Sequence, residues 1–131
     1  MAIKHHFFGK DCIIDRALTK RGDLIKNLKA KNFNFTDILF TNQIHSNRVI
    51  SVGEENKEAD GLITNLKNTV IAVYSADCCP ILLFCEEPQI IAAIHAGWKG
   101  VANGIIANTI KEINTDPTQI KAFIGPSITQ K

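Results

Sequence analysis

Short apolar runs separated by polar turns occur along most of the chain, and this pattern predicts β-strands. Strands are expected at residues 3–8, 37–41, 47–52, 69–74, 81–85, 90–94 and 121–124. The segment 86–89, Glu-Glu-Pro-Gln, is typical of a hairpin-like turn between two of them. Because successive apolar strands are joined by short turns, the pattern favours an α+β fold over a doubly wound parallel sheet.

Two segments have the periodicity of helices with one apolar face. Residues 21–31 form the first, and residues 101–113 form the second, which is expected to end at Asn114-Thr-Asp-Pro117. The predicted architecture is therefore α+β, with mixed β-sheets flanked by helices. The sequence contains no internal repeat and no apolar stretch that approaches the length of a membrane span.

Three residues of metal-binding type stand near the ends of predicted strands. His45 lies between two of them, Cys78 lies between an apolar run and Pro80, and His95 follows the run 90–94 directly. Two imidazoles and one thiolate leave a zinc ion an open fourth position, whereas a structural zinc normally takes four protein ligands. The alternative is three separate core residues, since free cysteine is commonly buried. Placement at strand ends, where Pro80 cannot continue a ladder, favours the metal site.

The cysteines indicate a reducing compartment. Two of the four, Cys78 and Cys79, are adjacent, and no signal-peptide pattern precedes Ile3, so a cytoplasmic location is expected. Adjacent residues of a strand point to opposite faces, which predicts that Cys79 packs in the core if Cys78 faces the metal. Cys85 is expected to be a buried apolar residue.

Five further polar or aromatic residues are candidates for the site. Arg48 could bind phosphate or carboxylate, or form a surface ion pair. Asp77 could hydrogen-bond a metal-bound imidazole, or shape a turn. Asp60 before Gly is more typical of a turn, although a place lining the site is also open. Trp98 could stack on a base or simply pack, and Lys99 would lie beside it at the mouth of the site.

Charge and size exclude several classes of protein. The net charge is only +2, with basic and acidic residues interspersed, so neither nucleic acid nor a membrane surface is an expected partner, although a small anion remains compatible. A chain of 131 residues with 45% hydrophobic residues can bury a substantial core. A single domain spanning residues 1–131 is expected.

The order and spacing of five strings resemble the YfiH family, also called the multicopper polyphenol oxidase or laccase-domain family, and the purine nucleoside phosphorylase family. The strings are Gln43-Ile-His-Ser46, Ala59-Asp-Gly-Leu-Ile-Thr64, Ala76-Asp-Cys-Cys-Pro-Ile81, His95-Ala-Gly-Trp-Lys-Gly100 and Ile124-Gly-Pro-Ser-Ile128. The resemblance implies a YfiH-like fold and places the metal ligands on His45, Cys78 and His95. Members usually continue well past the last string, so the C-terminal portion of the family fold is expected to be missing.

The resemblance implies a zinc-dependent purine nucleoside phosphorylase with adenosine deaminase activity, or a truncated fragment of one. Copper is the alternative metal, and a monomer or homodimer is expected. Purine nucleosides and phosphate would be the substrates. The expected catalytic residues are Asp77 and Arg48, and the expected substrate-binding residues are Arg48, Asp60, Trp98 and Lys99.

Three other functions stay open. A cysteine hydrolase or deamidase would use Cys78 as nucleophile and His95 as base. A copper-dependent, laccase-like polyphenol oxidase ranks lower, because its copper cluster needs many more histidines than the four in this chain. A non-catalytic metal or nucleoside binder is the third.

Overall fold

A computed structural model describes residues 3–8 and 21–127, which fall into two compact units, Met1–Thr36 and Asp37–Lys131. In the first unit, helix α1 (Arg21–Ala30) forms as predicted and buries Leu28. Residues 3–8 do not form the expected strand, and no strand lies among the described residues of this unit to pair with them. Cys12 lies outside the described residues.

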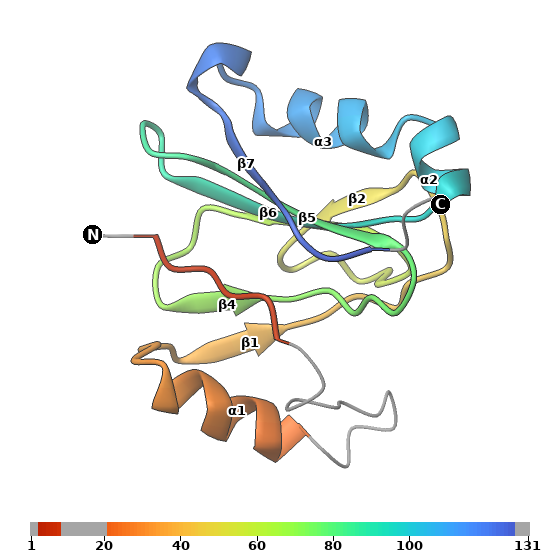
Figure 1. Ribbon diagram of the computed structural model, residues 1–131. Helices are drawn as coiled ribbons and strands as arrows, with labels where there is room; N and C mark the ends of the chain where they lie inside the picture. Colours follow the sequence, from red (N-terminus) through yellow and green to blue (C-terminus); the bar gives the residue numbers. More distant parts are fainter. Residues whose placement is uncertain (1–2, 9–20, 128–131) are drawn as a thin grey trace. The chain divides into compact units, whose positions relative to one another are not determined.

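The second unit is built on a five-stranded mixed sheet with the order β2-β3-β6-β5-β7 (Figure 1). Its strands are β2 (Val49–Ser51), β3 (Gly61–Thr64), β6 (Ile90–Ala96), β5 (Cys79–Cys85) and β7 (Lys121–Ile124). Only β2 and β3 are parallel, and the other neighbouring strands are antiparallel. A separate pair, β1 (Asp37–Leu39) and β4 (Thr69–Ile71), is parallel. The predicted α+β class with mixed sheets is confirmed.

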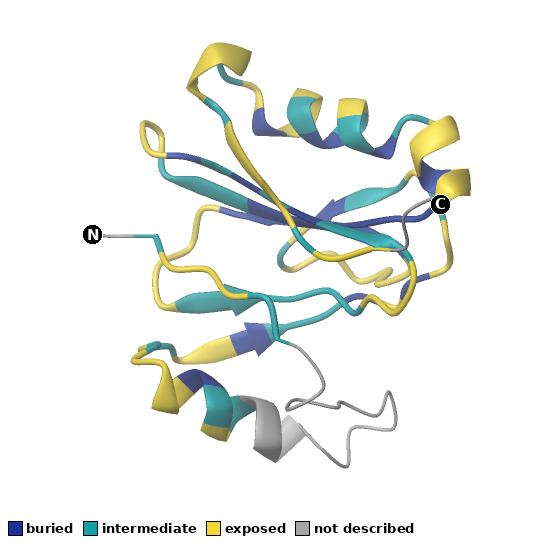
Figure 2. Cartoon of the chain, in the orientation of Figure 1, coloured by how far each residue is buried: buried dark blue, intermediate teal, exposed yellow. Residues whose placement is uncertain are grey.

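Helix α3 (Ile105–Ile113) covers one face of the five-stranded sheet (Figure 1), and Figure 2 marks residues of both the helix and the sheet as buried. Ile105 and Ile113 join a core cluster with buried isoleucines of β3, β5 and β6. Burying a side chain of this size contributes about 1.5–3 kcal/mol. A smaller cluster of Ile50, Ala59 and Leu62 packs against residues that include Leu39 and Ile71, from the two-stranded sheet.

Two predictions about these elements were wrong. The helix expected at residues 101–113 is divided into α2 (Trp98–Ala102) and α3, because Gly104 adopts a left-handed backbone with φ of 88° between them. Strand β3 was not predicted, since Asp60 before Gly61 suggested a turn. All four residues of β3 are in fact buried. A short 3₁₀ helix, η1 (Pro117–Gln119), follows α3.

The hairpin of β5 and β6 around residues 86–89 is confirmed and is longer than expected. Strand β6 continues past Ile94, so His95 is its penultimate residue, opposite Pro80, and Gly97 leads from the strand directly into α2 (Trp98–Ala102). Strand β7 is exposed along its length, and its side chains Phe123 and Ile124 are exposed large apolar groups.

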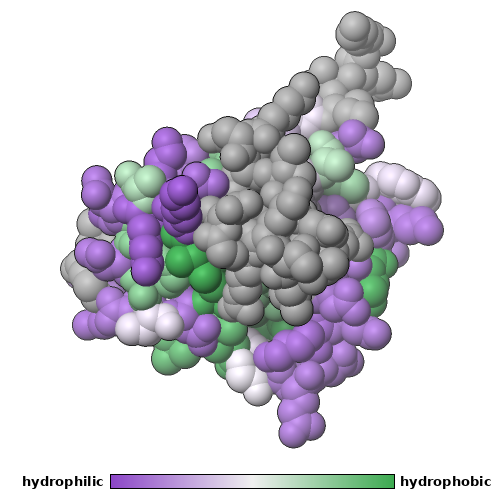
Figure 3. Space-filling view, turned by 90° about the horizontal axis from the view of Figure 1, so that it is seen from below, coloured by the Kyte–Doolittle hydropathy of each residue, from purple (hydrophilic) through white to green (hydrophobic). Residues whose placement is uncertain are grey.

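The surface of the described residues is mixed in character. Figure 3 shows hydrophilic side chains over much of one face, with smaller apolar areas between them. Within residues 3–8 and 21–127, no helix has the length and apolar character that a bilayer crossing requires.

Candidate metal centre

The side chains of His45, Cys78 and His95 converge in the second unit. Their potential ligand atoms all lie within 4.8 Å of one another, close enough for one metal ion to be held between them. His45 is exposed, Cys78 is half-buried and His95 is buried, so the cluster is open on the side of His45. The convergence expected from the sequence is observed, and the bound metal remains a prediction.

Each of the three residues is delivered by a different segment. His45 lies in the loop before β2, with a left-handed backbone at φ of 62°. Histidine is one of the few residue types enriched in this conformation, but it still costs free energy unless the surroundings hold it. Cys78 precedes β5 directly, and His95 is the penultimate residue of β6, at the end of the strand that lies away from the hairpin turn. The imidazole rings of His45 and His95 meet edge to face, with centroids 4.9 Å apart.

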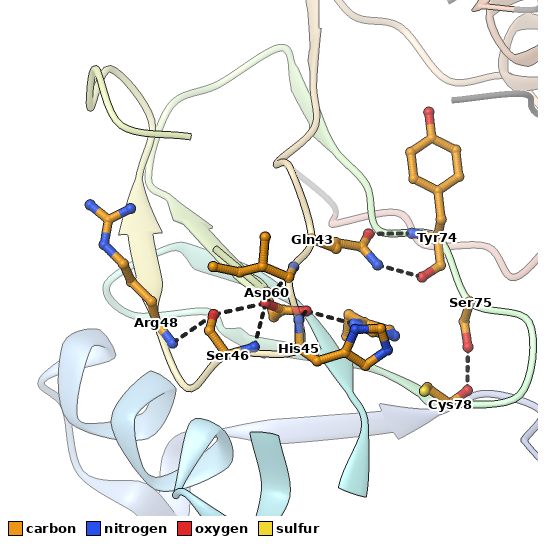
Figure 4. Close-up of polar contacts among 10 residues, drawn as sticks. Gln43, His45, Ser46, Arg48, Asp60, Tyr74, Ser75 and Cys78 are labelled. Carbon is orange, nitrogen blue, oxygen red and sulfur yellow. Dashed lines mark hydrogen bonds and ion pairs between the residues drawn. The ribbon is translucent and has the colours of Figure 1, made fainter. Parts of the chain in front are cut away.

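Asp60, just before β3, connects the two histidine segments (Figure 4). Its carboxylate is fully buried and lies 2.7 Å from Nδ1 of His95. It also accepts hydrogen bonds from the backbone N–H groups of Ile44, His45 and Ser46. With Nδ1 of His95 facing this carboxylate, Nε2 is the nitrogen that remains for a metal.

The contacts of Asp60 favour its ionised form. Burial by itself would raise the pKa of this carboxyl, but the hydrogen bonds from His95, Ser46 and Ile44 together outweigh burial and lower the pKa below its usual value. A negative charge therefore lies directly behind His95, on the side away from the cluster.

Gln43 connects the loop of His45 to the segment that carries Cys78 (Figure 4). Its side-chain amide donates to the carbonyl of Tyr74 and accepts from the N–H of Tyr74, both at 2.8 Å. Closer to the cysteine, the hydroxyl of Ser75 donates to the carbonyl of Cys78. The buried Gln43 thus imitates one rung of a β-ladder between two loops that have no strand pairing at this point.

Two glycines, Gly97 and Gly100, have no side chain where the segments that carry the cluster come close together. A Cβ atom at Gly97 would lie 3.1 Å from Cδ2 of His45 and 3.3 Å from Sγ of Cys78. One at Gly100 would lie 2.8 Å from the backbone carbonyl oxygen of Ser46. A side chain at Gly97 would therefore intrude between two of the candidate ligands. This space, together with a donor set of two imidazoles and one thiolate, fits a metal ion.

Cys79 has the role expected for a residue on the opposite face. It packs against the core cluster beneath α3, while Cys78 faces the histidines. Cys85 is buried, also as expected.

Arg48 and Asp77, the two residues expected to be catalytic, lie outside the cluster of His45, Cys78 and His95. The guanidinium of Arg48 extends away from His45 and is bound to the carbonyls of Asn56 and Glu58 and to the carboxylate of Glu54 (Figure 4). Asp77 is exposed in the bend before β5.

Trp98 and Lys99 are exposed at the start of α2, immediately after Gly97. The Nζ atom of Lys99 lies 5.6 Å from the centroid of the Trp98 ring. They follow Gly97 directly in the chain, the residue whose added Cβ would meet His45 and Cys78.

Sequence reasoning missed the roles of three residues. Gln43 and Ser46 lie within the string Gln43-Ile-His-Ser46 but were given no role, and Asp60 was not linked to either histidine. A polar residue at the start of a run such as Gly61-Leu-Ile-Thr64 is a weak signal for a buried carboxylate. The connection depends on strand pairing between β3 and β6, which the sequence does not display.

The comparison with known families decides the affiliation of the chain. The family model described as multi-copper polyphenol oxidoreductase laccase, the YfiH family, matches residues 19–131. The chain belongs to the YfiH family. A purine nucleoside phosphorylase of Rickettsia conorii is 42% identical over 114 residues, covering 82% of this chain and 48% of that protein. One of Campylobacter jejuni is 36% identical over 131 residues, covering 95% of this chain and 57% of that protein.

Solved structures of YfiH-family proteins have the same fold. A protein of Neisseria meningitidis superposes with a TM-score of 0.72 at 29% identity, covering 92% of this chain and 50% of that one. YfiH of Bacillus licheniformis gives a TM-score of 0.70 at 28% identity, covering 79% of this chain and 45% of that one. The chain spans about half the length of the curated relatives it matches.

Proposed function

We propose that this chain carries the metal centre of a zinc-dependent purine nucleoside phosphorylase that also deaminates adenosine. The observation that carries the proposal is the convergence of His45, Cys78 and His95 within 4.8 Å in a chain whose relatives are named purine nucleoside phosphorylases. Zinc is favoured because two imidazoles and one thiolate form a three-ligand shell of the type that catalytic zinc uses.

The residues of the chain have distinct tasks in this proposal. His45, Cys78 and His95 would hold the ion, and the exposed side of His45 is where a substrate would approach. When bound, the metal supplies positive charge and Lewis-acid polarisation. Exposed Lys99 would attract phosphate, and exposed Trp98 would stack on a purine ring.

Arg48 and Asp77 are the two expected catalytic residues, and they differ in how much their present contacts would have to change. Arg48 would bind phosphate only by releasing Glu54 and two backbone carbonyls. Asp77 is already exposed to solvent in the bend beside Cys78, where it could exchange a proton with a substrate.

The test combines metal analysis with two product assays. Purified chain should hold about one zinc per molecule. It should convert adenosine and phosphate to adenine and ribose 1-phosphate, and, without phosphate, adenosine and water to inosine and ammonia. His45→Ala should abolish both the metal and the activities, whereas Asp116→Asn, at an exposed carboxylate that caps the N-terminus of η1, should change neither. Metal at full occupancy without either product would refute the proposed activity and retain the metal site.

A cysteine hydrolase is a second candidate that one observation favours. His95 is hydrogen-bonded to the buried Asp60 at 2.7 Å. In this reading Cys78 would be the nucleophile, His95 the base, and Asp60 the carboxylate that orients His95. A metal-free purified chain whose Cys78 reacts rapidly with iodoacetamide would favour this candidate. Protection of the thiol by zinc would favour the metal centre.

A further inference from the structure

Asp60 uses both oxygens of its carboxylate, and each oxygen faces a different histidine segment. Oδ1 accepts from the N–H of Ile44 at 3.1 Å, the N–H of Ser46 at 2.8 Å and the hydroxyl of Ser46 at 2.7 Å. Oδ2 accepts from the N–H of His45 at 3.0 Å and lies 2.7 Å from Nδ1 of His95. The side chain has no exposed surface.

These five contacts leave no acceptor capacity for a ligand. A carboxylate offers about four lone-pair positions, so the interactions within the protein already saturate it. The side chain is also sealed from solvent. Asp60 therefore acts on the site through the residues that it contacts.

We propose that Asp60 is a positioning residue that sets the coordination geometry of both histidines at once. This inference rests on the proposed metal centre. On one side, the carboxylate holds the proton of His95 on Nδ1 and so presents Nε2 to the cluster. On the other, it binds three consecutive N–H groups and thereby holds His45 in its left-handed backbone conformation. A single buried charge thus aligns two ligands that are fifty residues apart in the sequence.

The carboxylate cannot be replaced by an amide at this position. Asparagine has one acceptor oxygen and one NH₂ donor, in place of two acceptor oxygens. If the oxygen faces the N–H groups of residues 44 and 46, the NH₂ group donates to Nδ1 of His95, and the ring proton moves to Nε2. If the oxygen faces His95, the NH₂ group opposes the N–H groups of the loop. In the first orientation the NH₂ group also opposes the N–H of His45, so Asp60→Asn disturbs at least one histidine in either orientation.

The experiment reads the tautomer first, in the metal-free protein. Long-range ¹H–¹⁵N spectra of the imidazoles, assigned with His45→Gln and His95→Gln, report which ring nitrogen carries the proton. In the wild type, the neutral ring of His95 should be protonated at Nδ1. In Asp60→Asn, either the His95 ring should no longer carry its proton on Nδ1, or the backbone amide resonances of the loop around His45 should shift.

Metal binding is the second readout. Competition with a chromophoric chelator should show a loss of about 10–100-fold in zinc affinity for Asp60→Asn, as is typical when the hydrogen-bond partner of a ligand is removed. The Co²⁺ form should lose intensity in its d–d bands as the tetrahedral geometry is distorted. Asp116→Asn is the matched control, with the same chemical change at an exposed residue, and should match the wild type in every readout.

The outcomes separate this inference from the proposed function. A proton on Nε2 of His95 in the wild type would overturn it, and so would a folded Asp60→Asn protein with unchanged affinity and Co²⁺ spectrum. If Asp60→Asn does not fold, the wild-type tautomer and the milder Ser46→Ala variant, which removes one contact to Oδ1, still decide the question. Wild-type protein that shows the Nδ1–H tautomer but binds no metal would refute the metal centre and support the positioning of His95.

Discussion

Gly97→Ala should weaken metal binding without weakening the fold. The backbone at Gly97 has φ of −77° and ψ of 166°, an extended conformation that alanine adopts freely. The new methyl group would nevertheless lie 3.1 Å from Cδ2 of His45 and 3.3 Å from Sγ of Cys78. In the metal-free protein, the exposed ring of His45 can move aside by a few tenths of an ångström at little cost.

A bound metal removes that freedom. The distance from a metal to its ligand atom tolerates only about 0.2 Å of change, so the ring of His45 cannot both avoid the methyl group and keep its bond to the metal. Overpacking by one methyl group costs about 1–3 kcal/mol, and here that cost falls on the metal-bound state alone. Zinc affinity should therefore fall by about 5–150-fold. The metal-free stability should stay within about 1 kcal/mol, because a lower chain entropy in the unfolded state offsets the loss of glycine before α2.

Gly104→Ala provides the opposite pattern as a control. Gly104 has φ of 88°, and a Cβ there would meet nothing within 4 Å. Alanine should cost about 1–2 kcal/mol of stability through backbone strain, with unchanged metal affinity. Urea denaturation of the metal-free proteins and chelator competition measure the two quantities separately.

The reasoning fails if Gly97→Ala binds zinc as tightly as the wild type. It also fails if Gly97→Ala loses as much metal-free stability as Gly104→Ala, because the contact would then belong to the fold and not to the bound state.

Three further results are expected. Elemental analysis should show no bound zinc in Cys78→Ala, whereas Cys79→Ala should keep its zinc and be less stable in chemical denaturation. The opposite result would mean that Cys79 is the ligand. Gln43→Leu should lower the free energy of unfolding by about 1–3 kcal/mol and weaken zinc binding, because two buried hydrogen bonds between loops are lost; unchanged zinc binding would show that this bridge does not position the cysteine. Gly100→Ala should be the most destabilising glycine change, since its Cβ would lie 2.8 Å from a backbone oxygen of Ser46, and a midpoint in urea equal to that of the wild type would contradict it.

The central hairpin could be predicted from the sequence because its residues are apolar without interruption. Ile81-Leu-Leu-Phe and Ile90-Ile-Ala-Ala-Ile94 leave little choice but buried strands around a turn with proline. The break between α2 and α3 could not be predicted in the same way, because apolar residues keep helical spacing across Gly104. A glycine inside a helical pattern is compatible with either a continuous or an interrupted helix, and only the packing of α3 on the sheet decides.

The candidate ligands were accessible to sequence reasoning for a different reason. Residue type and placement near strand ends favour His45, Cys78 and His95, and the resemblance to the YfiH family places the ligands on the same three residues. The residues that hold them were not accessible, because aspartate and glutamine are common on surfaces. The roles of Asp60 and Gln43 arise only when β3 pairs with β6 and two loops come side by side.

The contacts described for the cluster lie within one unit of the chain. They are made by residues from Gln43 to Gly100, inside the unit Asp37–Lys131. The proposed metal affinity therefore rests on residues of this unit. Nucleoside specificity can depend on further residues, because the relatives named purine nucleoside phosphorylases are about twice as long as the matched region. Zinc binding therefore tests the metal site, and phosphorolysis tests the proposed activity. A chain that binds zinc tightly but phosphorolyses slowly would agree with the geometry described for His45, Cys78 and His95.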